Sequence, residues 1–181
     1  AFEKYIQTMN NVIAKGGTEV VWNTSDGFKV IHVKNKQLKP KRISIVLPKS
    51  RRYTDIRNIV YSKEVSPSKM RSAISPNYIH SLDAELLRRV ALRMRDEGIE
   101  SSDWIHDSFG CLPNEVGRML EITKEEFLEM MEKDPLSFLD RELRRQAIRN
   151  GVSEKQLSKV VVPNLGIVEF SKVLESEWFF S

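Results

Sequence analysis

Residues 101–113 of the chain read Ser-Ser-Asp-Trp-Ile-His-Asp-Ser-Phe-Gly-Cys-Leu-Pro, and this stretch decides the fold. Apolar side chains surround a polar centre formed by His106-Asp107-Ser108, and Pro113 closes the run. Short apolar segments on either side of a polar turn are typical of a tight β-hairpin. The pattern therefore predicts a hairpin with His106 and Asp107 near its tip.

Asp107 is the candidate for chemistry in this hairpin. An acidic side chain among apolar neighbours is costly to bury unless it binds a cation or is otherwise paired. Mg²⁺ takes oxygen ligands, and two such ions can clamp the attacking and leaving oxygens of a phosphoryl transfer. The alternative is a turn aspartate that accepts hydrogen bonds from backbone amides. A Ser-His-Asp triad of Ser108, His106 and Asp107 is excluded, because adjacent strand residues point to opposite faces.

The sequence upstream of the hairpin begins with a predicted helix and continues with strands. Residues 2–13 carry apolar side chains at helical spacing. Residues 18–24 and 28–34 are rich in β-branched and aromatic residues and flank a Ser-Asp-Gly turn, which predicts a second hairpin. Residues 42–47 alternate as a strand does, and residues 57–61 are expected to pair beside them.

A long helix is predicted just before the 101–113 hairpin. Residues 62–74 are polar and predict an irregular segment. Ser75 followed by Pro76 has the pattern of an N-cap with proline in the first helical turn. Apolar residues then recur at helical spacing until Gly98. We therefore expect one helix that starts at Pro76 and stops at Gly98.

Helices are predicted to dominate after the hairpin, because helix-boundary signals follow it. These signals are two capping boxes and one Asp-Pro start with a glycine stop: Thr123 with Glu126, Ser153 with Gln156, and Asp134-Pro135 with Gly151. The order helix, β-rich segment, helix, hairpin and further helices predicts an α+β fold.

The composition describes a soluble globular protein with one or at most two cores. The chain has 181 residues, of which 40% are hydrophobic and 30% are charged. No apolar stretch approaches the roughly 20 residues that span a bilayer, and no signal segment opens the chain. We therefore expect no membrane association and, by default, a cytoplasmic location. The single cysteine, Cys111, excludes an internal disulfide.

The net charge of +4 is modest support for an anionic partner. Basic residues gather in three groups: Lys34 to Arg42; Lys49, Arg51, Arg52 and Arg57; and Arg88, Arg89, Arg93 and Arg95. Such groups either contact phosphates or form an ordinary solvated face. Charge alone leaves both interpretations open.

Several other classes of site are excluded by missing motifs. The chain has no G-x-x-x-x-G-K-[ST] phosphate loop, no G-x-G-x-x-G fingerprint and no H-E-x-x-H pattern. Its three histidines and single cysteine are too few and too scattered for a zinc site.

Four segments of the chain share a further pattern. They are W-N-T-S-D-G-F at residues 22–28, S-P-N-Y-I-H-S-L-D at 75–83, I-H-D-S-F-G at 105–110 and L-E-S-E-W-F-F-S at 174–181. Their order and spacing resemble the single-subunit DNA-dependent RNA polymerases of bacteriophages and mitochondria. In that family a P-N-F/Y-hydrophobic-H-S-x-D segment opens a helix, and an H-D-S hairpin called motif C follows it.

The resemblance implies part of the palm and fingers of a right-hand polymerase, incomplete without a partner segment. Residues 1–74 would form an N-terminal helix and a β-rich segment. Residues 75–181 would form a palm segment with the motif C hairpin, C-terminal helices and a terminal tail.

The resemblance also implies a catalytic role for the hairpin tip. Asp107 occupies the position of the motif C aspartate and would bind two catalytic Mg²⁺ ions shared with a partner segment. His106 would flank the site and help to place Asp107 or the primer end; the alternative is a structural imidazole.

Further residues are placed near nucleic acid by the same resemblance. His80 matches a histidine near the minor groove at the active-site end of the RNA–template duplex. Asp83 would share a helix face with His80, or else cap the helix or orient His80. For Tyr78, core packing is favoured over base stacking. Phe180 and Ser181 would lie close to the catalytic centre.

The chain departs from the family by lacking motif A, with the other metal-binding aspartate, and motif B, which grips the incoming nucleotide. We therefore expect activity only together with a chain that supplies both motifs. This chain would be a fragment or one subunit of a split enzyme, with a DNA template, an RNA product and ribonucleoside triphosphates as further partners. The expected location is the cytoplasm, of the host cell for a viral protein, or alternatively the mitochondrial matrix.

Two alternatives stay open at this point. DNA polymerases with a similar palm carry a His-Asp hairpin that is usually followed by Glu, whereas Ser108 follows here and favours the RNA family. A different class is a non-catalytic nucleic-acid-binding or scaffold subunit with a vestigial motif C.

Overall fold

The computed structural model describes residues 1–14, 18–38, 41–46, 53–105, 108–164 and 166–176, with only the backbone described at 41–46 and 53–58. In chain order the elements are α1 (Phe2–Ala14), β1 (Val20–Asn23), β2 (Lys29–His32), β3 (Asn35–Gln37), β4 (Lys41–Val46), β5 (Tyr53–Asn58), β6 (Tyr61–Val65), α2 (Pro67–Asp96), β7 (Ser102–Ile105), β8 (Ser108–Cys111), α3 (Val116–Glu132), α4 (Pro135–Arg149), α5 (Glu154–Leu157) and α6 (Lys172–Glu175). The predicted α+β class is confirmed.

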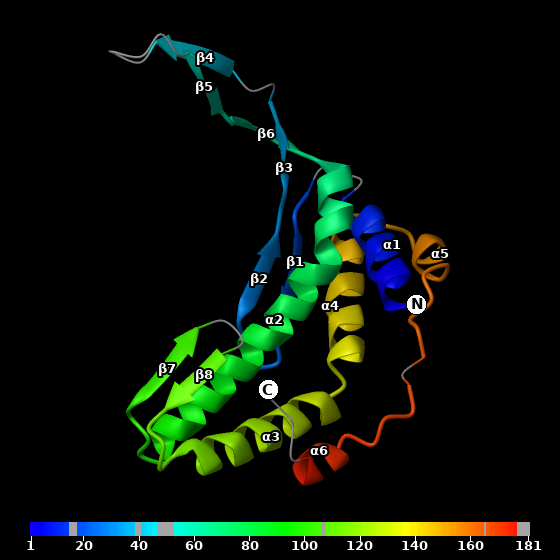
Figure 1. Cartoon of the computed structure of the whole chain (residues 1–181). Helices are drawn as coiled ribbons and strands as arrows, with labels where there is room; N and C mark the ends of the chain where they lie inside the picture. Colours follow the sequence, from blue (N-terminus) through cyan, green and yellow to red (C-terminus); the bar gives the residue numbers. More distant parts are fainter. Residues whose placement is uncertain (15–17, 39–40, 47–52, 106–107, 165, 177–181) are drawn as a thin grey trace.

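Antiparallel pairs make up the β-structure of the described residues. The pairs are β1–β2, β3–β6, β4–β5 and β7–β8. Figure 1 shows β3–β6 and β4–β5 extending away from the helices as an arm. The hairpins predicted at 18–34 and 101–113 are confirmed. The strand that pairs with β4 is β5 at residues 53–58. The prediction placed this strand at residues 57–61, a few residues too far along the chain.

Helix α2 begins nine residues before its predicted start. The segment predicted to be irregular contains β6 and the first turns of α2 instead. Ser66 with Pro67 repeats the Ser-Pro start signal, and Met70 and Ile74 are fully buried, so packing favours the earlier start. Pro76 lies inside the helix, where it has no N–H for the backbone hydrogen-bond ladder.

Local capping signals were correct at two helices and wrong at a third. Asp134 caps α4 by accepting a hydrogen bond from the Ser137 amide at 3.1 Å, and the capping box at the start of α5 is present. Thr123 does not start a helix, because α3 already begins at Val116. Its hydroxyl donates to the Met119 carbonyl one turn earlier, at 2.7 Å.

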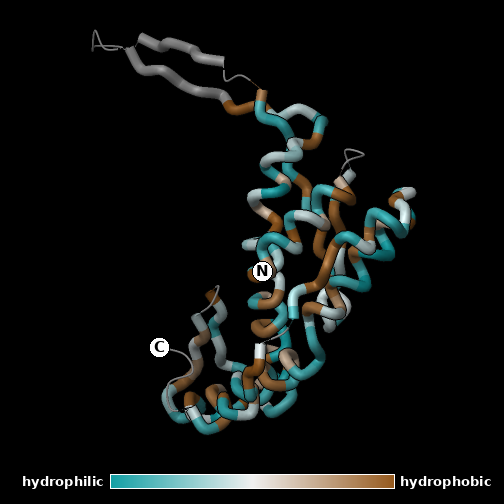
Figure 2. Tube along the Cα trace, turned by 90° about the vertical axis from the view of Figure 1, so that its right-hand side faces the viewer, coloured by the Kyte–Doolittle hydropathy of each residue, from teal (hydrophilic) through white to brown (hydrophobic). Residues whose placement is uncertain are grey.

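Two clusters of buried side chains form the core of the described part of the chain. In the first, α1, β1, the first half of α2 and α4 pack together; in the second, the last half of α2 packs against α3 and the β7–β8 hairpin. Figure 2 shows hydrophobic and hydrophilic stretches alternating along the helices, as amphipathic packing requires. Helix α2 joins the clusters. The segments expected at residues 1–74 and 75–181 meet within this helix, and that division stays a prediction.

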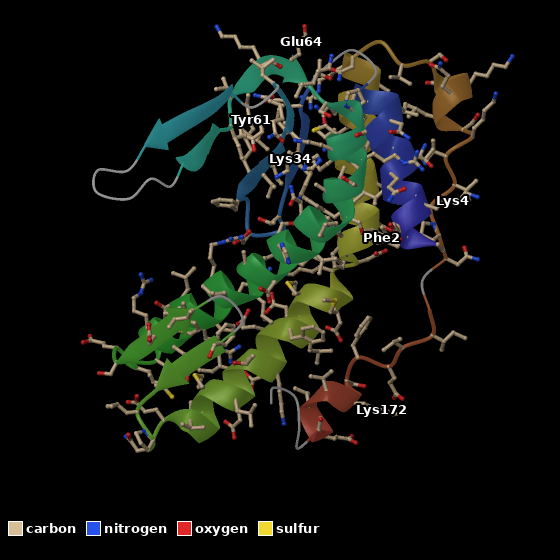
Figure 3. The ribbon with its side chains drawn as sticks, turned by 45° about the horizontal axis from the view of Figure 1, so that its top comes forward. Phe2, Lys4, Lys34, Tyr61, Glu64 and Lys172 are labelled. Carbon is tan, nitrogen blue, oxygen red and sulfur yellow. The ribbon has the colours of Figure 1, made fainter. Side chains whose placement is uncertain are left out.

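The base of the arm is attached to the start of α2. The Lys69 ammonium lies 5.5 Å from the centre of the Tyr61 ring, and the Ser66 amide donates to the Lys34 carbonyl at 2.7 Å. Figure 3 shows Lys34, Tyr61 and Glu64 gathered at this junction. Within the described part of the chain, no helix combines the length and apolarity needed to cross a membrane.

Candidate active site

The β7–β8 ladder leads directly to the predicted catalytic residues. Its pairs run from Ser102 opposite Cys111 to Ile105 opposite Ser108. His106 and Asp107 stand between the last two partners in the sequence and lie outside the described residues. The predicted chemical roles of both residues stay predictions.

Aromatic packing holds the hairpin against the helices. The Trp104 and Phe109 rings lie 5.0 Å apart, and the Trp104 indole N–H donates to the Ser102 hydroxyl at 3.0 Å. Both rings pack against the second core cluster, which contains Val90 of α2 and Ile122 of α3. The hairpin therefore rests on a rigid support made by two helices.

His80 and Asp83 lie three residues apart in the middle of α2. The His80 side chain is exposed, and Asp83 is half-buried. The spacing places both on one side of the helix, as expected. Asp83 cannot cap this helix, because α2 starts at Pro67; that alternative was wrong. Among the described residues, neither side chain has a hydrogen-bond partner, so Asp83 does not orient His80 through a direct bond here.

Tyr78 belongs to the core. Its hydroxyl donates to the Pro135 carbonyl at 2.9 Å, and its ring lies 6.1 Å from Trp22 and 5.5 Å from Phe2. Burial raises the pKa of the Tyr78 hydroxyl well above its ordinary value. This environment agrees with the interpretation that favoured core packing over base stacking.

The W-x-T-x-D-G-F segment packs along α2. The Trp22 indole N–H donates to the Ser81 hydroxyl at 3.1 Å, next to His80 in the chain. Arg88 donates to both carboxylate oxygens of Asp26, at 2.6 and 3.0 Å. Burial alone would raise the pKa of Asp26, but the hydrogen bonds from Arg88 and Thr24 outweigh it and lower the pKa to about 2.

The basic group on α2 is occupied by carboxylates. Besides Arg88 with Asp26, the pairs are Arg89 with Glu85, Glu126 and Glu129; Arg93 with Glu97, Glu125 and Glu126; and Arg95 with Asp96. These arginines are thus held by protein contacts, which the charge pattern alone did not reveal. A signal was present in the sequence: acidic residues stand four positions from Arg89 and Arg93 in α2.

The metal site cannot be completed by the described residues, which contain no group of three His, Cys, Asp or Glu side chains able to hold an ion. The role of Asp107 as a metal ligand stays a prediction, because this residue lies outside the described part of the chain. Phe180 and Ser181 also lie outside the described residues. The chain is described up to Ser176, whose carbonyl accepts a hydrogen bond from Lys124 of α3.

The sequence profile of the DNA-dependent RNA polymerases matches residues 3–164, nearly the whole chain. The chain belongs to this family. It is 30% identical to the DNA-directed RNA polymerase of Enterobacteria phage T3 over 165 residues and 30% identical to T7 RNA polymerase of Escherichia phage T7 over 166 residues. It is also 27% identical over 184 residues to the mitochondrial DNA-directed RNA polymerase 1 of Arabidopsis thaliana.

The matched region is a small part of these polymerases. The phage alignments cover 90% of this chain but 18% of each relative, and the Arabidopsis alignment covers 17% of its relative. A DNA-directed RNA polymerase 1A of Nicotiana tabacum is 26% identical over 94% of this chain and is itself covered completely. The chain thus spans less than a fifth of the length of the phage and Arabidopsis polymerases that it matches.

Proposed function

We propose that this chain is the C-terminal catalytic portion or subunit of a single-subunit-type DNA-dependent RNA polymerase. The observation that carries the proposal is the β7–β8 ladder, whose strands precede and follow His106-Asp107 in the sequence and pack against two helices in a member of this family. The names of the relatives support ribonucleotides as substrates and DNA as template.

The proposed reaction forms one phosphodiester bond in each cycle. The 3′-hydroxyl of the RNA loses its proton to solvent, and its oxygen attacks the α-phosphorus of a ribonucleoside triphosphate. The bond between the α-phosphorus and the oxygen that bridges to the β-phosphate breaks, and pyrophosphate leaves with that electron pair. When bound, two Mg²⁺ ions would lower the pKa of the hydroxyl and neutralise charge on the phosphates. Asp107 would hold these ions together with an aspartate from the rest of the polymerase.

Other residues would orient the nucleic acid in this proposal. The exposed imidazole of His80 is free to meet the RNA–template duplex, while Tyr78 supports α2 from the core. His106 would help to place Asp107, and the terminal residues Phe180 and Ser181 would lie beside the site. The partner chain would supply motifs A and B. The proposed location is the cytoplasm, or alternatively the mitochondrial matrix.

The test is primer extension on a DNA template by the complete polymerase, with Mg²⁺ and either ribonucleotides or deoxyribonucleotides. Asp107→Ala is expected to slow ribonucleotide addition by at least about 10³-fold, because losing a metal ligand removes several kcal/mol of transition-state stabilisation. Asp103→Ala is the matched control, since this exposed aspartate lies on the same hairpin. Its effect should stay within about threefold.

The outcomes separate the proposal from its alternatives. A preference for deoxyribonucleotides would indicate a DNA polymerase palm. Ribonucleotide extension that survives Asp107→Ala would show that the metal site lies elsewhere and that this chain is a non-catalytic nucleic-acid-binding subunit.

A further inference from the structure

Glu85 is a buried carboxylate on the side of α2 that faces away from His80. It is 1% exposed, although it belongs to a residue type that is rarely buried unless paired. It lies five positions after His80 in the sequence, which corresponds to about 140° around an α-helix. Glu85 thus lies behind the proposed nucleic-acid face and is not placed to contact substrate.

The β1–β2 turn supplies the first partners of Glu85. The Ser25 backbone amide donates to Oε2 at 3.1 Å, and the Ser25 hydroxyl donates to Oε1. Ser25 belongs to the W-x-T-x-D-G-F segment. The next residue of this segment, Asp26, pairs with Arg88, which lies one helical turn after Glu85 in α2. These contacts attach the hairpin to α2 through backbone and side chain together.

Arg89 extends the same contacts to α3. Its Nε donates to Glu85 at 3.1 Å, and its Nη1 reaches Glu126 and Glu129 of α3, each at 3.4 Å. Burial alone would lower the pKa of Arg89, but the bonds to Glu85 and Glu126 raise it above its ordinary value, so the guanidinium stays charged. Arg93 also donates to Glu126, at 3.2 Å.

The two helices joined by this network are the ones that support the β7–β8 hairpin. Helix α2 contributes Leu86, next to Glu85, to the cluster beneath Trp104 and Phe109, and α3 contributes Ile122 and Met130. Glu126 lies one helical turn from each of these α3 residues. A change in the spacing of α2 and α3 at this network therefore moves the support of the hairpin.

We propose that Glu85 is a positioning residue: with Ser25, Arg89 and Glu126 it holds the β1–β2 turn, α2 and α3 in one arrangement, so that the Asp107 hairpin and His80 meet the same substrate. The proposal rests on the proposed polymerase function. It predicts that Glu85 affects the rate of bond formation more than the binding of nucleotides, because motif B, which grips the nucleotide, is not part of this chain.

The test compares Glu85→Gln with Glu129→Gln in the complete polymerase. Both remove one carboxylate charge beside Arg89, but Glu129 is exposed at its side chain and also pairs with Lys133. Glu85→Gln is expected to lower the rate of single-nucleotide addition about tenfold or more, because small misplacements of reacting groups cost that much. The nucleotide KM should change less than about twofold, since substrate contacts are left in place. Glu129→Gln leaves the Arg89 contacts to Glu85 and Glu126 in place and should change both quantities by less than about twofold.

Hydrogen exchange gives a readout that does not depend on activity. In Glu85→Gln, amides of residues 102–105 and 108–111 should exchange at least about tenfold faster, while those of α4 remain unchanged. Arg89→Lys, which keeps the charge but loses the planar fork, should show the same pattern more weakly. If Glu85→Gln does not fold, the exchange pattern of Arg89→Lys tests the proposal in its place.

The proposal would be overturned if amide exchange in Glu85→Gln became faster only at the β1–β2 turn. It would also be overturned if this variant had a lower melting temperature but an unchanged rate of nucleotide addition. In either case Glu85 would be a purely structural residue. If Asp107→Ala retains activity, the proposed function fails. The exchange pattern would still decide separately whether Glu85 positions the hairpin.

Discussion

Asp26 illustrates how a single turn residue is set by a partner far along the chain. Its carboxylate accepts hydrogen bonds from the Arg88 guanidinium, 62 residues away, and from the Thr24 hydroxyl. The same guanidinium lies 4.5 Å from the centre of the Phe28 ring. A charged turn and an exposed aromatic ring are thus held by one arginine on α2.

We predict that Asp26→Asn removes a pH-dependent part of the stability of the chain. The pKa of Asp26 is lowered from 3.8 to about 2 in the folded protein, so the ionised form stabilises the fold above pH 3.8. That contribution is lost as the pH falls through about 2. Above pH 5 the variant should be less stable by about 1 kcal/mol, less than the full shift implies because water screens this surface pair.

Urea unfolding at several pH values measures this effect. The difference between wild type and Asp26→Asn should shrink as the pH is lowered from about 4 towards 2. Asp96→Asn is the control, because Asp96 is largely exposed and, among the described residues, pairs with its neighbour Arg95 alone. A constant difference at every pH would contradict the assigned ion pair.

Helix α2 is the element that organises the molecule, and its C-terminal end is specified by local chemistry. Gly98 has φ +85°, its amide donates to the Arg95 carbonyl, and the Ile99 amide donates to Met94, both at 2.9 Å. This is the Schellman arrangement, and buried Ile99 completes it by packing in the same cluster as Met94. The stop directs the chain into the β7–β8 hairpin.

Gly98→Ala is therefore expected to destabilise the chain by about 1 kcal/mol, because a Cβ disfavours the left-handed backbone. The new methyl group would meet no atom within 4 Å, so the effect isolates the backbone. Gly117→Ala in α3 is the matched control, with equal space and a helical backbone. It should stabilise by about 0.5 kcal/mol. Denaturant unfolding measures the change in the free energy of unfolding for both variants. Equal changes at Gly98 and Gly117 would refute the left-handed backbone assigned to Gly98.

At the scale of the whole molecule, the described chain leaves apolar side chains and strand edges uncovered. Phe28 is 55% exposed, Ile31 of β2 is 51% exposed and Ile105 of β7 is 61% exposed. Each described sheet has two strands, so outer edges remain open. In the proposed polymerase, a partner polypeptide would cover these surfaces.

We predict that the isolated 181-residue chain associates with itself as its concentration rises, because exposed apolar surface and open edges favour aggregation. Adding the polypeptide that carries the rest of the polymerase should replace this association with a defined complex. Sedimentation velocity measures both the self-association of the chain and the formation of the complex. A compact monomer at high concentration, with or without that polypeptide, would show that the exposed surface is not an interface.

The sequence by itself was sufficient for the features encoded within a few neighbouring residues. The pairing of β7 with β8, the turn at Ser25-Asp26-Gly27, and the boundaries at Gly98 and Asp134 were predicted correctly. Turn and cap preferences are local, because they depend on the φ angles and hydrogen bonds of adjacent residues. The same locality allowed the four motifs to indicate the family before any packing was known.

Only the tertiary structure decided where α2 begins and what its charged residues do. Ser66-Pro67 and Ser75-Pro76 are equivalent start signals in the sequence, and the burial of Met70 and Ile74 selects the first. The arginines of α2 are a basic cluster in the sequence but ion-pair partners in the fold, since their carboxylates come from the β1–β2 turn and α3 as well as from α2 itself. Contacts between residues 30 or more positions apart form only after the chain has packed, and therefore no local pattern could predict the buried Glu85.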